Sequence, residues 1–293
     1  MVPPRFRMID EVSAAHAAVR TRFISPRRGA PALELVESSA DGVRRPPVLF
    51  VHGAFGGAWM WREVFFPHFI AAGFPVAAFS LRGHGASHGR EVLRKAALAD
   101  FVEDLRAALA EMPAPPIVIA HSLGGLIAQL LIGRVEMKAL VLMASLPPDG
   151  MFFVTPRLAL TDTAIFIEAF LSSITGSRVP LQAAAHQVLF SEGLPRDRVH
   201  RYASLMVPES PRALAEAHAP GVILPARHFD LPTFVIGGDN DRLVWRASTW
   251  RTALYHGAEH ETAVGLGHFM QLDIGADGMA KRVIAWLEER LRL

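Results

Sequence analysis

Short, almost entirely apolar runs alternate with helical patterns along this 293-residue chain, and this alternation restricts the fold more than any other feature. Such runs are typical of strands buried on both faces, as in a parallel sheet. They predict strands at residues 48–51, 75–79, 117–120 and 139–143, and an antiparallel edge pair at residues 19–24 and 32–37. Helical spacing between them is shown by Leu98, Phe101, Val102, Leu105 and Leu109. The pattern predicts an α/β fold with a mostly parallel central sheet flanked by helices.

A long segment without strand patterns interrupts this alternation. From Pro147 to Leu231 the sequence offers helical patterns and no convincing strand. Strand patterns return at residues 233–236 and 261–264, and a last helix carries Val283, Ile284, Leu287 and Leu291 on one stripe. We therefore expect a core domain made of residues 1–146 and 232–293, with a helical cap inserted at residues 147–231.

The composition excludes several classes of protein. An apolar fraction of 51% with 20% charged residues is not that of a disordered chain. Because the chain has no cysteine, it has no disulfide, no thiolate metal site and no cysteine nucleophile. The isoelectric point of about 9.4 is high although the net charge is only +2, because a chain with no cysteine and two tyrosines has few groups that titrate between pH 7 and 10. The basic residues are scattered along the sequence. Nucleic-acid binding needs positive charge gathered on one face, so we expect no nucleic-acid partner.

No targeting or membrane-spanning pattern is visible in the sequence. No apolar stretch of about 7–15 residues follows the first residues, so we expect no secretory signal. The longest apolar tract, residues 117–133, is interrupted by polar residues and glycines and is too short to span a bilayer. We expect a cytoplasmic protein without stable membrane insertion, either a monomer or a homodimer.

The sharpest chemical signal is the segment at residues 120–125, Ala-His-Ser-Leu-Gly-Gly, which lies between a predicted strand and an apolar helix at residues 126–132. This context is typical of a nucleophile elbow, in which a tight turn exposes the hydroxyl of the serine, here Ser122. Small residues are needed two positions before and after the serine, because larger ones would collide with neighbouring backbone. Ala120 stands where the usual Gly-x-Ser-x-Gly pattern has its first glycine. The alternative is an ordinary glycine turn of a βα unit.

With this motif the chain resembles the α/β-hydrolase family, and two loops extend the resemblance. Residues 52–57, His-Gly-Ala-Phe-Gly-Gly, follow an early strand, where this family places its oxyanion loop. Residues 80–87 look like the loop that the family carries after its next strand. The resemblance implies an α/β-hydrolase fold and an oxyanion hole made by the backbone N–H groups of Ala54 and Leu123. It gives His84 a structural role rather than a catalytic one.

A serine hydroxyl becomes a good nucleophile only when a base takes its proton and a carboxylate orients that base. The family's chain order is serine, acid, histidine. The resemblance selects Asp241 as the acid, with Asp239 and then Asp149 as alternatives. It selects His268 as the base, on a small-residue loop after the last predicted strand.

Two further histidines, His256 and His260, stand four positions apart, which is a spacing that metal sites use. No third ligand is placed beside them, so we interpret them as surface histidines. The mechanism that the resemblance implies needs no metal and no organic cofactor.

The resemblance implies a serine hydrolase, similar to esterases and lipases, that cleaves a small-molecule carboxylic ester through an acyl-enzyme on Ser122. Other chemistry on the same three residues stays open: C–C bond hydrolysis, amide hydrolysis, acyl transfer or perhydrolysis. A ligand receptor of this fold with slow turnover also stays open. The apolar cap suggests a pocket for a hydrophobic acyl chain or ring, lined by Phe55, Trp59, Phe166, Phe170 and Phe269. The alternative is that these side chains only pack the cap onto the core.

Overall fold

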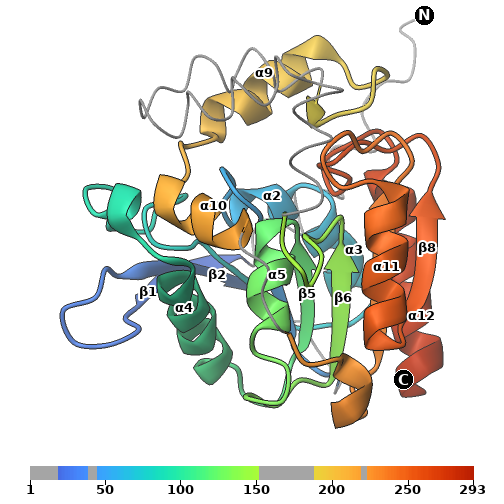
Figure 1. Cartoon of the computed structure of the whole chain (residues 1–293), viewed down its shortest axis with the longest axis horizontal. Coiled ribbons are helices and arrows are strands. Elements are labelled where there is room, and N and C mark those ends of the chain that lie inside the picture. Colours follow the sequence, from blue (N-terminus) through green and yellow to red (C-terminus); the bar gives the residue numbers. More distant parts are fainter. Residues whose placement is uncertain (1–18, 39–44, 152–187, 219–222) are drawn as a thin grey trace, which may run out of the picture.

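The computed structural model describes residues 19–38, 45–151, 188–218 and 223–293, and in these ranges it contains one eight-stranded sheet (Figure 1). The strands, in chain order, are β1 (Arg20–Ile24), β2 (Leu33–Ser38), β3 (Val48–Val51), β4 (Val76–Phe79), β5 (Ile117–His121), β6 (Ala139–Met143), β7 (Thr233–Gly238) and β8 (Glu259–Ala263). Their order in the sheet is β1-β2-β4-β3-β5-β6-β7-β8. Strands β1 and β2 are antiparallel to their neighbours, and β3 to β8 are parallel. The mostly parallel sheet with an antiparallel edge pair is confirmed.

The central strands are buried on both faces, which explains why they read as unbroken apolar runs. Every residue of β3 to β7 is buried. Alternate residues of one strand enter two separate cores: Ile119 of β5 faces one core, and Val118 and Ala120 face the other. A strand with two buried faces has no need of polar positions, so its sequence shows no alternation.

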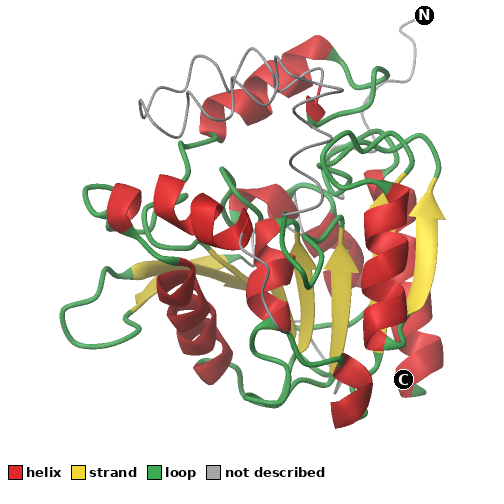
Figure 2. Ribbon diagram, viewed as in Figure 1, coloured by secondary structure: helices red, strands yellow, loops and turns green. Residues whose placement is uncertain are grey.

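Helices cover both faces of the sheet (Figure 2). Helices α3 (Phe65–Ala71) and α12 (Ala276–Leu291) pack against each other and share one core, in which Val283 and Leu287 confirm the predicted stripe. The other core is covered by α4 (Leu98–Ala110), α5 (Leu123–Gln129) and α11 (Arg246–His256). Shorter helical elements are α2 (Trp59–Arg62), η1 (Leu93–Lys95) and η2 (Ala226–Phe229).

The described part of the segment between β6 and β7 contains α9 (Arg196–Leu205) and α10 (Pro211–His218) and no strand. Helix α9 lies beyond the carboxyl ends of the parallel strands (Figure 1). Residues 152–187, and with them Phe166 and Phe170, lie outside the described residues. The division into a core and a cap at residues 147–231 stays a prediction.

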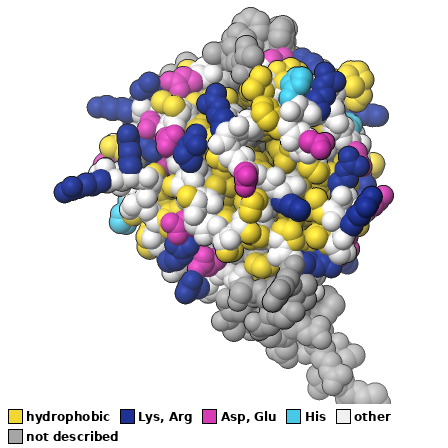
Figure 3. Space-filling view, turned by 90° about the horizontal axis from the view of Figure 1, so that it is seen from below, with side chains coloured by type: hydrophobic (Ala, Val, Ile, Leu, Met, Phe, Trp, Pro, Cys, Tyr) yellow, Lys and Arg dark blue, Asp and Glu magenta, His cyan; other side chains and the backbone are white. Residues whose placement is uncertain are grey.

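The surface at the amino ends of the parallel strands carries mixed charge. Lys and Arg side chains are spread over this face with acidic and apolar side chains between them (Figure 3). Within the described ranges, no helix is both long enough and apolar enough to cross a membrane.

Candidate active site

Ser122 occupies the sharp turn between β5 and α5. Its φ of 52° and ψ of −120° are strained for a residue with a side chain, a state that costs about 1–3 kcal/mol and is typical of functional sites. The turn is fixed from β6, because the Ser122 N–H donates to the carbonyl of Met143 (3.1 Å) and the Ser122 carbonyl accepts from the N–H of Leu146 (3.1 Å). This geometry is that of the nucleophile elbow that the motif predicts.

Glycines allow the elbow and the loop after β3 to approach each other. A Cβ on Gly124 would run into the carbonyl oxygen of His52, and one on Gly53 would lie 2.7 Å from the Cβ of Ser122. The second small position of the motif is therefore a steric necessity, whereas Ala120 fits in the buried strand β5. Helix α5 begins at Leu123, three residues before the predicted start. The predicted start is too late because glycine has a low helix propensity, whereas close packing requires glycine at these positions.

His268 lies between Ser122 and Asp241 in an unbroken chain of hydrogen bonds. Its Nε2 is 2.9 Å from the Ser122 Oγ, and its Nδ1 is 2.8 Å from the Asp241 Oδ2. The side chains of His268 and Asp241 are 3% and 0% exposed, so little water competes for these bonds. When the Nδ1–H donates to the carboxylate, the Nε2 lone pair faces the serine hydroxyl.

Asp241 is held in place by the backbone that follows it. Its Oδ1 accepts hydrogen bonds from the N–H groups of Leu243 and Val244, both at 2.8 Å. The two alternative acids are engaged elsewhere: Asp239 is exposed and accepts from the N–H of Gly265 (2.6 Å), and Asp149 pairs with Arg251 (3.1 Å). The structure thus brings Asp241, and neither alternative, to His268.

The backbone around His268 is fixed from several directions. The ring of His121 bonds through Nε2 to the carbonyl of His268 (2.9 Å), and the N–H of Phe269 donates to the carbonyl of Leu189 (2.7 Å). The buried carboxylate of Asp273 accepts the N–H of Gly267 (2.8 Å). Burial and the neighbouring His268 hold the pKa of His121 well below its usual range, so this ring is neutral and donates through Nε2.

Two backbone N–H groups flank the elbow. Leu123 is the first residue of α5, and the N–H of a first helical residue has no acceptor within the helix. Ala54 belongs to the loop after β3, which pairs with β5. Among the described residues, neither N–H donates a hydrogen bond. Free N–H donors beside a serine hydroxyl are the groups that would stabilise an oxyanion if this serine attacked a carbonyl carbon.

Comparison with known proteins agrees with this geometry. Residues 48–282, most of the chain, match the alpha/beta hydrolase family. The chain belongs to the α/β-hydrolase family. Methylesterase 3 of Arabidopsis thaliana is 33% identical over 85 residues, which are 28% of this chain and 32% of that protein. The match therefore spans about a third of the length of this relative.

Solved structures with the same fold cover almost the whole of this α/β hydrolase. The esterase EaEST from Exiguobacterium antarcticum has a TM-score of 0.74 and 14% identity, covering 92% of this chain and 100% of its own. The enol-lactonase from Burkholderia xenovorans LB400 has a TM-score of 0.70 and 18% identity, covering 91% and 99%. A carboxylesterase structure from Nitrososphaera gargenis has a TM-score of 0.68 and 17% identity, covering 92% and 99%. At these identities the likeness shows the fold.

The other histidines near the site of this hydrolase have structural partners. His84 is buried, with Nδ1 3.0 Å from the carbonyl of Arg82 and Nε2 3.1 Å from the carboxylate of Glu209. His52 accepts the N–H of Leu81 at Nε2 (2.9 Å), and burial lowers the pKa of His52 to about 3. The structural role expected for His84 agrees with these contacts.

The interpretation of His256 as a surface residue is wrong. His256 ends α11 and His260 lies on β8, so their spacing is not that of one helix face. His256 is buried, accepts the N–H of Ala226 at Nδ1 (2.9 Å) and pairs with Gln129 through Nε2 (2.8 Å). The described part of the chain contains no group of three or more His, Asp or Glu side chains that could hold a metal ion.

The described residues of the predicted pocket join the segment between β6 and β7 to the core. The ring of Trp59 stacks on Tyr202 of α9 with centroids 6.2 Å apart, and Phe269 meets Phe190 edge to face at 5.6 Å. Phe55 and Trp59 are half-buried, whereas Phe269 is fully buried. The pocket itself stays a prediction.

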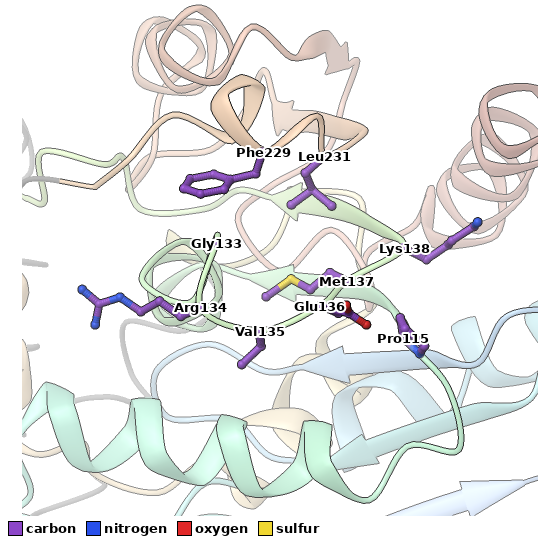
Figure 4. Close-up of a pocket in the computed structure, with 9 residues that line it drawn as sticks. All are labelled: Pro115, Gly133, Arg134, Val135, Glu136, Met137, Lys138, Phe229 and Leu231. Atoms are coloured by element: carbon purple, nitrogen blue, oxygen red, sulfur yellow. The ribbon is translucent and has the colours of Figure 1, made fainter.

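A separate surface cavity of about 480 Å³ lies at the amino ends of the parallel strands, at the other end of the strands from Ser122 (Figure 4). It is lined by residues of the segments that lead into β5, β6 and β7. Its lining contains no serine and no histidine: Pro115, Gly133, Arg134, Val135, Glu136, Met137, Lys138, Phe229 and Leu231. This cavity therefore offers no serine and no histidine that could act together as nucleophile and base.

Two residues near the site gave no usable signal in the sequence. His121 stands beside the serine as a single polar residue at the end of an apolar strand. Glu209 comes from the segment between α9 and α10 and reaches His84 across 125 positions of the chain. Only the fold brings these contacts together.

Proposed function

We propose that this α/β hydrolase is a serine hydrolase that cleaves small-molecule carboxylic esters through an acyl-enzyme on Ser122. The observation that carries the proposal is the chain of hydrogen bonds from Ser122 through His268 to Asp241, at 2.9 and 2.8 Å. The names of the related proteins, a methylesterase, esterases and an enol-lactonase, support the ester class of substrate.

In the first half of the reaction, the Nε2 of His268 accepts the Ser122 proton while the Oγ attacks the ester carbonyl carbon. The carbonyl electrons move to oxygen, and the N–H groups of Ala54 and Leu123 donate to the oxyanion that forms. One such donor contributes roughly 10²–10³-fold in rate. Asp241 accepts the Nδ1–H and stabilises the imidazolium ring.

Collapse of this intermediate breaks the bond between the carbonyl carbon and the alcohol oxygen. The imidazolium of His268 protonates the departing alcohol, and the acyl group stays on the Ser122 Oγ. Water then enters, gives its proton to the neutral His268 and attacks the acyl carbon. A second collapse releases the carboxylic acid and returns the proton to Ser122.

The test is turnover of p-nitrophenyl esters of graded acyl length by the wild type and by Ser122→Ala. We expect turnover by the wild type and a loss of roughly 10⁴-fold or more in Ser122→Ala, because the nucleophile is gone. Ser38→Ala is the matched control, since Ser38 is a buried serine on β2, outside the site. More than a few per cent residual activity in Ser122→Ala contradicts the proposal.

The same series tests the expected hydrophobic pocket. Aromatic side chains beside the site, such as Phe55 and Trp59, favour an apolar acyl chain or ring. We expect the specificity constant to rise from acetate toward longer or aromatic acids. A maximum at acetate without any response to longer acids contradicts a hydrophobic pocket, while the serine mechanism stands.

A further inference from the structure

Glu209 is a buried carboxylate that the reaction described above does not use. It lies between α9 and α10 and is only 1% exposed. Its Oε2 is 3.1 Å from the Nε2 of His84, and the other ring nitrogen of His84 is 3.0 Å from the carbonyl of Arg82. With an acceptor at each nitrogen, the His84 ring carries two N–H groups and forms an ion pair with Glu209.

The charge state of this pair follows from its surroundings. Burial alone would lower the pKa of His84, but the adjacent Glu209 carboxylate, helped by the carbonyl of Arg82 and the charge of Asp104, outweighs burial and raises this pKa. Both side chains are completely enclosed. A buried charge needs its partner, so the ion pair fixes the position of the Glu209 carboxylate inside the protein.

The same carboxylate reaches the loop that follows β3. The N–H of Phe55 donates to the Oε2 of Glu209 (3.4 Å), and the carbonyl of Phe55 accepts the N–H of Val207 (3.1 Å). Phe55 has a φ of 65°, in the left-handed region that a residue with a side chain avoids. Such a conformation persists only where surrounding contacts hold it. The segment from Val207 to Glu209 supplies these contacts on both sides of Phe55.

Phe55 directly follows Ala54, so a change of backbone angles at Phe55 re-aims the neighbouring peptide groups. We propose that Glu209 is a positioning residue for ester hydrolysis: anchored by His84, it holds Phe55 and thereby keeps the N–H of Ala54 aimed at the developing oxyanion. This inference rests on the proposed function. The segment between β6 and β7 then acts on the rate of the chemical step as well as on substrate binding.

The experiment compares an ester with its thionoester, in which sulfur replaces the carbonyl oxygen. Sulfur accepts hydrogen bonds poorly, so a loss of oxyanion donation slows the ester more than the thionoester. For Glu209→Gln, which keeps the shape of the side chain, we expect kcat on the ester to fall roughly tenfold, because a misaimed donor loses part of its 10²–10³-fold contribution. The KM should change less than about twofold, and the ester-to-thionoester ratio of kcat/KM should fall roughly tenfold.

Ser210→Ala is the matched control. Ser210 is the next residue, is buried, and its hydroxyl donates to the carbonyl of Ala96 (2.6 Å). Its bond to the Glu209 carboxylate comes from its backbone N–H (2.7 Å), which the variant keeps. The Ser210→Ala substitution removes the hydrogen bond to Ala96 and should leave the ester-to-thionoester ratio unchanged. Glu209→Asp is the second variant if Glu209→Gln does not fold. The aspartate keeps the charge and withdraws the carboxylate by one methylene, so we expect the same fall in the ester-to-thionoester ratio.

Two results overturn the inference, and they differ from failure of the proposed function. An unchanged ratio in folded Glu209→Gln or Glu209→Asp, or an equal fall in Ser210→Ala, shows that Glu209 has only a structural role. A wild-type protein that hydrolyses no ester overturns the proposed function, and the inference falls with it. A fall in the ratio confined to the Glu209 variants supports the inference.

Discussion

Two aspartates after β7, Asp239 and Asp241, stand two positions apart and differ only in their surroundings. Asp241 is buried, accepts two backbone N–H groups and faces His268. Asp239 is exposed and accepts the N–H of Gly265. Because the two residues share their type and almost their position, they form a matched pair for testing which carboxylate orients the histidine.

Asp241→Asn should lower kcat on a p-nitrophenyl ester by roughly 10³–10⁴-fold, because an amide favours the wrong tautomer of His268 and does not stabilise its imidazolium. The measurement is steady-state kinetics near neutral pH, with circular dichroism to show that the fold is kept. Asp239→Asn should stay within about threefold of the wild type, since surface substitutions away from special features have small effects. Equal losses in the two variants would rule out the assignment of Asp241.

At the level of elements, α11 shows how a histidine becomes part of a core. Its inward face carries Thr249, Thr252 and His256, which are all buried. His256 then links α11 to Gln129 of α5 and to the N–H of Ala226. Burial lowers the pKa of His256 to about 4. The folded protein therefore holds this ring neutral.

The stability of the protein should consequently depend on pH below the pKa of an unfolded histidine, about 6.5. At pH 7 the ring is neutral in the folded protein and mostly neutral in the unfolded chain, so this residue contributes little to the dependence there. As the pH falls from 6.5 toward 4, the unfolded chain takes up a proton that folded His256 does not, so the free energy of unfolding decreases. The decrease from this one residue reaches about 2 kcal/mol at pH 5.

Urea unfolding at pH 7 and pH 5 measures this effect. His256→Gln should be less stable than the wild type at pH 7, and it should lose about 2 kcal/mol less on going to pH 5. His88→Gln, at an exposed histidine, is the control and should follow the wild type. An identical pH dependence in His256→Gln and the wild type would show that the ring is not held neutral by the fold.

Most elements could be predicted from the sequence because their signals are local. Strands β3 to β7 are buried on both faces, and this leaves an unbroken apolar run in each. The start of α5 is the instructive exception. Gly124 and Gly125 oppose a helix by propensity, and only their packing against His52 and Ser145 explains why they are there.

At the scale of the whole molecule, the candidate site lies at the carboxyl edge of the parallel strands, which is where α/β sheets typically bind ligands. Loops after β3, β5, β7 and β8 supply Ala54, Ser122, Asp241 and His268. Ser122 and His268 are 146 positions apart in the chain and 2.9 Å apart in space. Their motifs could be found because each loop keeps its own local pattern.

The supporting contacts could not be found in this way. Glu209 carries no local pattern, and its partners Phe55 and His84 lie more than 100 positions away. In the sequence His121 is only one residue of the elbow motif. In the structure its ring forms a hydrogen bond with the carbonyl of His268, 147 positions further along the chain. The sequence shows which residues have reactive chemistry, and the fold decides which residues hold them in place.

The central claim is that Ser122 is the nucleophile of this assembled site, and covalent labelling tests it most directly. The protein is treated with a fluorophosphonate, which reacts with activated serines, and its intact mass and peptides are measured. We predict one adduct per chain on Ser122, much slower labelling of Asp241→Asn, and none of Ser122→Ala. No adduct on Ser122, or an adduct on another residue that persists in Ser122→Ala, would contradict this account.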